Sequence, residues 1–129
     1  MLEETASGGD PVTLLLSNDM RLRQLNRQFR GKDKPTNVLS FVSSDRGYLG
    51  DVAIALGVVE HEAREQGKPL PDHAAHLAVH GILHLKGYDH EKASDRRRME
   101  AIETVILSRL GVPPPYTARA YPQNPNAID

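Results

Sequence analysis

Residues 80–90, HGILHLKGYDH, constrain the fold more than any other part of the chain. Histidines four apart on an α-helix are offset by about 40° and stand roughly 5–6 Å apart at Cβ, so His80 and His84 lie on one face. Gly87 can adopt a positive φ, which ends the helix and turns the chain so that His90 returns toward the same point. The segment therefore predicts a helix and a tight turn that bring three imidazoles together.

Three convergent imidazoles predict a metal centre. The spacing H-x-x-x-H-x-x-G-x-x-H is the frame of the metzincin zinc site. The chain has no cysteine, so we expect His80, His84 and His90 to hold one Zn²⁺ ion, although imidazole also suits other divalent metals. Three protein ligands leave one position open, which is typical of a catalytic metal that activates water.

The residue after the first histidine separates two kinds of chemistry. Metzincin-type peptidases carry a glutamate there as general base, whereas this chain has Gly81. Peptide hydrolysis must deliver a proton to a poor leaving group, so the glycine argues against a peptidase. Phosphodiester cleavage depends mainly on stabilising charge on phosphoryl oxygens. A metallopeptidase and a non-catalytic metal-binding module remain as alternatives.

Four neighbouring polar residues have weaker interpretations. His76 is expected to orient a ligand or to line the cleft, and His73 to be a satisfied polar residue near the helix start. His61 lies among charged residues and is expected to be solvated. Asp89 either orients a ligand imidazole or accepts a proton from the metal-bound water, or it is an ordinary turn residue.

Hydrophobic periodicity predicts an α+β fold, in which a small mixed sheet packs against helices. We expect strands at 12–17, 38–43 and 48–56, a helix at 20–29 with Leu22, Leu25 and Phe29 on one stripe, a helix at 58–67, a central helix within 68–87, and a last helix capped by Ser94 and closed by Gly111. The first two strands flank a helix as in a βαβ unit, and the second and third are close enough for a hairpin. Residues 12–111 would form one domain between a flexible start, 1–11, and a proline-rich tail, 112–129.

Composition and charge limit the expected location and binding partners of the protein. The 129 residues carry a net charge of −1, which gives no sign of non-specific nucleic-acid binding. Neither a long apolar run nor a signal-peptide pattern is present, so we expect a cytoplasmic protein without membrane association. Residues 21–34 hold six basic residues against one acid, which in isolation indicates a solvated helix face and loop.

Two motifs together, HGILHLKGYDH and FRGKDKPTNVLSF, resemble the YbeY family of bacterial endoribonucleases, over roughly residues 12–111. The resemblance implies a metal-dependent, single-strand-specific endoribonuclease with an α+β fold. It implies a role in rRNA processing, at the 3′ end of small-subunit 16S rRNA, and in ribosome quality control. The family's metal, usually taken as zinc, would be held by His80, His84 and His90, and an arginine essential for cleavage matches Arg30.

The chemistry of the second motif agrees with that role. Arg30 offers a planar fork of donors suited to phosphate oxygens, and Lys32 and Lys34 extend the contact to RNA as point charges. A net charge of −1 leaves targeting to the ribosome or to ribosome-associated proteins. Family members usually carry a further strand and helix ahead of the segment that starts at residue 12. Only about ten residues precede it here, so either the sheet lacks an edge strand or the start codon is assigned late.

Overall fold

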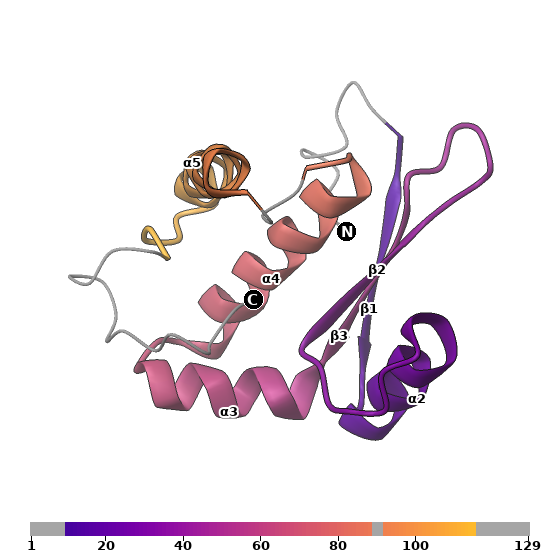
Figure 1. Ribbon diagram of the computed structural model, residues 1–129. Helices are drawn as coiled ribbons and strands as arrows, with labels where there is room; N and C mark the ends of the chain where they lie inside the picture. Colours follow the sequence, from indigo (N-terminus) through magenta and orange to yellow (C-terminus); the bar gives the residue numbers. More distant parts are fainter. Residues whose placement is uncertain (1–9, 89–91, 116–129) are drawn as a thin grey trace.

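A computed structural model describes residues 10–88 and 92–115 and shows an α+β fold, as predicted. Figure 1 shows a small sheet beside a set of helices. The elements in chain order are β1 (Val12–Ser17), α2 (Asp19–Arg30), β2 (Val38–Val42), β3 (Gly50–Ala55), α3 (Leu56–Gln66), α4 (Leu70–Leu85) and α5 (Ala93–Arg109). The predicted N-terminal segment and tail lie mostly outside the described residues.

The sheet has the order β1-β3-β2, with β1 parallel and β2 antiparallel to β3. The predicted hairpin between β2 and β3 is confirmed. The predicted βαβ relation between β1 and β2 is wrong, because these strands lie on opposite sides of β3 and run in opposite directions. Because the connection between β2 and β3 is short, β2 pairs with one edge of β3, and β1 pairs with the other edge.

Helices cover both faces of the sheet (Figure 1). On one face, Leu22 of α2 packs with Leu39, Ala53 and Ala55. On the other, α4 and α3 pack their apolar side chains against Val52 and Ile54. Residues 52–55 are all buried, so β3 is covered on both faces and by a strand on each side.

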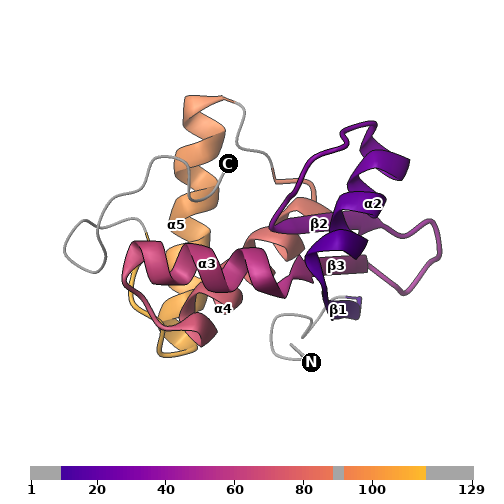
Figure 2. The ribbon, with the colours of Figure 1, turned by 90° about the horizontal axis from the view of Figure 1, so that it is seen from below.

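The central helix ends as its glycine predicts. Gly87 has a φ of 95°, and the backbone N–H of Tyr88 donates to the carbonyl of Leu83 at 3.0 Å, which closes the last turn. Ten residues of α4 are buried, and the helix lies between the sheet and α5, as the view from below in Figure 2 also shows. This burial fixes the orientation of His73, His76 and His80, whereas His84 is partly buried.

The last helix differs from its prediction at the start. Lys92 occupies the N-cap and makes no side-chain cap, so Ser94 lies inside the first turn and does not cap the helix. Its C-terminal end agrees, since Gly111 has a φ of 78°. Within the described part of the chain, none of the helices combines the length and apolar character needed to cross a membrane.

Candidate metal and phosphate site

His80 and His84 point toward a common position on α4. Their Nε2 atoms lie 3.1 Å apart, and their ring centroids are 4.6 Å apart. Two nitrogens bound to one tetrahedral zinc at about 2.0–2.1 Å would be roughly 3.3 Å apart, so the pair fits a shared ion. His80 is buried and His84 is only partly buried, so the position between them opens on the side of His84.

Glu103 of α5 holds the ring of His80. Its Oε2 lies 2.5 Å from Nδ1 of His80, while its other oxygen lies 3.3 Å from Nε2 of His76. A histidine that donates from Nδ1 to a carboxylate keeps the lone pair of Nε2 for a metal. Glu103 therefore sets both the orientation and the tautomer that His80 needs as a ligand.

Glu103 is ionised although it is completely buried. Burial alone would raise its pKa, but the hydrogen bonds from His76 and His80 outweigh that effect and hold the pKa at about 2. Burial lowers the pKa of His76, which keeps this imidazole neutral as a donor. The result is an anion fixed behind His80.

The sequence interpretation missed Glu103. A signal was present, because this acid lies on the buried stripe of α5, four residues from both Met99 and Leu107. A lone carboxylate on a core face is rarely tolerated without a partner. His76 is buried and shares Glu103 with His80, and its expected role in orienting a ligand stays a prediction.

The third predicted ligand, His90, and its neighbour Asp89 lie outside the described residues. Within residues 10–88 and 92–115, no group of three histidine or carboxylate side chains is arranged to hold a metal. His80 and His84 are arranged as two ligands of one ion would be, and the metal-binding role of His80, His84 and His90 stays a prediction.

Arg30 is connected to the histidine helix through Ser40 of β2. Its Nη2 donates to the carbonyl of Ser40 at 2.9 Å, and the hydroxyl of Ser40 donates to the carbonyl of Gly81 at 2.9 Å. Gly81 is the residue after His80, so two hydrogen bonds link the guanidinium to the turn of α4 that carries His80. In the described part of the chain, no carboxylate pairs with Arg30, which leaves donors for a phosphate.

The other cations of the basic segment are placed differently. Lys32 and Lys34 are exposed in the loop after α2. Arg23 is paired with Asp33 at 2.9 Å, so the one acid of the segment is partly neutralised. The structure therefore puts Arg30 in a defined position and leaves Lys32 and Lys34 as solvent-facing charges.

Gly81 also explains the missing glutamate in steric terms. A Cβ built at this position would lie 2.7 Å from Cγ1 of Val52 and 3.0 Å from Oγ of Ser40. Val52 is fully buried and stiff, so α4 could not carry a side chain here without moving away from the sheet. The general base of a metzincin-type peptidase therefore has no room.

The remaining histidines take structural positions. His73 is fully buried and satisfied, as expected, and its Nε2 lies 2.8 Å from Oε1 of Glu62. His61 is exposed, as expected, and pairs with Glu65 on the same helix at 2.5 Å.

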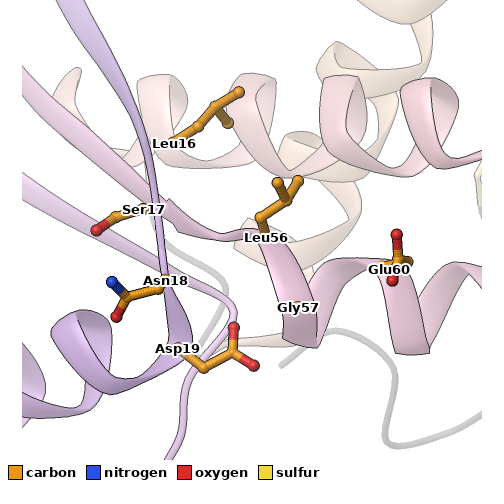
Figure 3. A pocket seen from close by; sticks show the side chains of 7 residues that line it. All are labelled: Leu16, Ser17, Asn18, Asp19, Leu56, Gly57 and Glu60. Carbon is orange, nitrogen blue, oxygen red and sulfur yellow. The ribbon is translucent and has the colours of Figure 1, made fainter.

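A hollow of about 600 Å³ lies elsewhere, where β1 meets α2 and α3 begins (Figure 3). Its lining includes no histidine and no residue of α4. Oδ1 of Asp19 accepts the backbone N–H of Val58 at 3.0 Å, and this caps α3, whose own N-cap Ala55 has no capping side chain. The carboxylate of Asp19 thus has a structural role in this hollow.

Comparison with known proteins shows the family of the chain. Residues 2–111 match the family model described as "Endoribonuclease YbeY". The chain belongs to the YbeY family. Proteins named Endoribonuclease YbeY include one from Rhodopseudomonas palustris, 49% identical over 121 residues, and one from Bordetella parapertussis, 56% identical over 99 residues. These alignments cover 88% and 74% of the present chain but only 64% and 63% of those relatives, so the chain spans less than two thirds of their length.

A solved structure supports the fold assignment for this YbeY family member. The solution structure of TM1509 from Thermotoga maritima superposes with a TM-score of 0.57 at 28% sequence identity. The match covers 84% of this chain and 75% of that protein. The resemblance seen in the two motifs is thus confirmed over most of the chain.

Proposed function

We propose that the protein is a metal-dependent endoribonuclease that cleaves single-stranded RNA. The names of its relatives support RNA cleavage, and the absence of room at Gly81 argues against a peptidase. The observation that carries the proposal is the hydrogen-bonded connection from Arg30 through Ser40 to Gly81, beside His80. It holds the guanidinium that we propose to bind phosphate near a pair of convergent imidazoles.

In this proposal His80, His84 and His90 hold one divalent ion, with zinc as the expected metal. When bound, such an ion supplies Lewis-acid stabilisation of charge on the scissile phosphate. Glu103 orients His80 and lends it negative charge from behind. The carboxylate and the imidazole are fixed before substrate arrives, so little reorganisation is needed.

Arg30 acts on the phosphoryl group. Its planar guanidinium can donate two hydrogen bonds to the non-bridging oxygens and stabilise the charge that builds up on them. Attack by water or by the 2′-hydroxyl produces the same charge, so the role of Arg30 is common to both routes. Lys32 and Lys34 would contact neighbouring phosphates.

The proposed biological substrate is ribosomal RNA, at the 3′ end of the small-subunit 16S rRNA, together with defective ribosomes in quality control. A chain with a net charge of −1 offers little general attraction for RNA, which supports targeting by the ribosome or a ribosome-associated protein in the cytoplasm.

The test is cleavage of end-labelled single-stranded and duplex RNA by the purified protein. We expect cleavage of the single strand only, loss of cleavage in EDTA, and recovery when Zn²⁺ is restored. His84→Ala should lose both bound metal and cleavage. His61→Ala, which removes an exposed histidine, is the matched control and should retain both.

The second test separates Arg30 from the metal. Arg30→Ala should lower kcat by about 10²- to 10³-fold, the usual effect of removing one donor to transition-state charge, while metal content stays unchanged. Arg64→Ala, which removes an exposed arginine on α3, should cleave at the wild-type rate. Full activity in Arg30→Ala, or peptide cleavage without RNA cleavage, would contradict the proposed function.

A further inference from the structure

The only two phenylalanines of the chain lie together at the β2 side of the sheet, and the chain has no tryptophan. Phe29 is in the last turn of α2 and Phe41 is on β2, with ring centroids 5.4 Å apart and planes inclined at 71°. Phe41 is partly buried against the Leu22 cluster, whereas Phe29 is 59% exposed. One ring is therefore anchored in the core and supports a second ring that faces solvent.

The aromatic pair adjoins the residues that hold Arg30. Phe29 precedes Arg30 in the chain, and Phe41 follows Ser40, whose carbonyl accepts the hydrogen bond from the Arg30 guanidinium at 2.9 Å. The helix end and the strand are thus joined twice, by ring contact and by this hydrogen bond. A strand of RNA whose phosphate reached Arg30 would have its adjoining nucleotide close to Phe29.

Core packing does not explain the exposure of Phe29. The stripe that it shares with Leu22 and Leu25 predicts burial, yet Leu22 is fully buried while most of the Phe29 ring is in water. The surrounding segment is basic, with Arg27 two residues earlier in the chain and Lys32 three residues later in the loop after α2. An exposed ring among cations fits a ligand that is both aromatic and anionic.

We propose that Phe29, supported by Phe41, is a stacking platform for a nucleobase of single-stranded RNA next to the phosphate bound by Arg30. This inference rests on the proposed function and adds a base-binding subsite to it. Stacking on an aromatic ring is available only to unpaired bases and tolerates any base, because each has a π-face. The subsite would therefore contribute preference for single strands without sequence preference.

A direct binding test uses the absence of tryptophan. Phe29→Trp introduces the only indole of the chain, at a position exposed enough to accept it. A short 2′-O-methyl oligoribonucleotide, which lacks the 2′-hydroxyl nucleophile, is added while indole fluorescence is recorded. We expect quenching by the intact oligonucleotide and much weaker quenching by one of the same length that carries only abasic sites.

A kinetic test asks whether the flat ring matters, as opposed to apolar surface. Phe29→Leu keeps an apolar side chain but removes the π-face, so KM for single-stranded RNA should rise roughly 5- to 30-fold with kcat within about twofold. Phe29→Tyr should restore wild-type KM. Met20→Ala, at the other end of α2 and 71% exposed, is the matched control and should leave KM unchanged.

The outcomes separate the stacking platform from the nuclease. Wild-type cleavage with an unquenched indole and an unchanged KM in Phe29→Leu would overturn the platform and leave the nuclease standing. Quenching that depends on the bases, without cleavage by any form of the protein, would support the platform and overturn the nuclease. Equal quenching by intact and abasic oligonucleotides would also overturn the platform, since it would report phosphate contacts alone.

Discussion

Helix α4 carries three buried histidines that contact glutamates: His73 contacts Glu62, whereas His76 and His80 share Glu103. Only the Glu103 group belongs to the candidate site. His73 pairs with Glu62 of α3 at 2.8 Å, and His80 pairs with Glu103 of α5 at 2.5 Å. The difference lies at the second ring nitrogen. Nε2 of His80 faces His84 at 3.1 Å, whereas Nδ1 of His73 is buried with no hydrogen-bond partner in the described part of the chain.

The two glutamates also differ in what else they hold. Glu62 accepts from the amide of Asn37, just before β2, at 3.3 Å, so this pair connects α3, α4 and the sheet. Glu103 of α5 hydrogen-bonds two histidines of α4 and so joins these two helices. The contact of His73 with Glu62 therefore has a structural role, whereas His80 and Glu103 belong to the candidate ligand set. The surroundings of the second ring nitrogen make this difference.

Glu103→Ala is expected to have the largest effect on stability. It leaves His76 and His80 buried without their anion and opens a cavity, which should lower the free energy of unfolding by about 3–5 kcal/mol. Urea unfolding of the metal-free protein measures this loss. Glu60→Ala, which removes an exposed partner of Arg64 at 3.6 Å, should change stability by less than about 0.5 kcal/mol. A loss below about 1 kcal/mol in Glu103→Ala would contradict the central position given to this carboxylate.

Glu103→Gln tests the ligand-orienting role while preserving volume. The amide is a poorer acceptor for Nδ1 of His80, so zinc affinity should fall by about 10- to 100-fold. Competition with a chromophoric chelator measures it. Glu62→Gln makes the same change at the other pair and should leave zinc affinity within about twofold of wild type. Equal losses in both variants would show that the pairs are not functionally distinct.

Glu62→Ala is expected to have a smaller structural effect than Glu103→Ala. The side chain of Glu62 is 18% exposed, so water can reach part of the space it leaves, and only one histidine loses a partner. We expect a loss of about 1–2 kcal/mol in the free energy of unfolding, with zinc affinity unchanged. The same urea titration measures it, and a loss as large as that of Glu103→Ala would reverse the ranking of the two pairs.

The sequence predicted the site as far as local geometry reaches. His80, His84 and the stop at Gly87 follow from helix periodicity and glycine φ, which depend on nearby residues only. Glu103 and Ser40 join the site through packing between elements distant in the chain, for which spacing carries no information. The wrong βαβ interpretation has the same origin, because β3 determines which strands are neighbours. Leu22 is fully buried as its stripe predicts, whereas Phe29 on the same stripe is 59% exposed, a difference that periodicity alone does not predict.

The smallest expected effect on stability involves Lys68, which interacts with Glu62, the partner of His73. Burial lowers the pKa of Lys68 to about 8, against the attraction of Glu62 and Asp72. The unfolded chain, with a lysine pKa near 10.5, binds more protons than the folded chain between pH 8 and 10.5, so stability rises with pH in that window. From pH 8 to pH 9, the free energy of unfolding should rise by on the order of 1 kcal/mol relative to that of Lys68→Met. Chemical denaturation at the two pH values measures this difference, and parallel profiles would show that Lys68 keeps its proton despite burial.

Zinc affinity should be the same in the wild type and in Lys68→Met. Lys68 interacts with Glu62, at the end of α4 that carries His73, and does not hold His80.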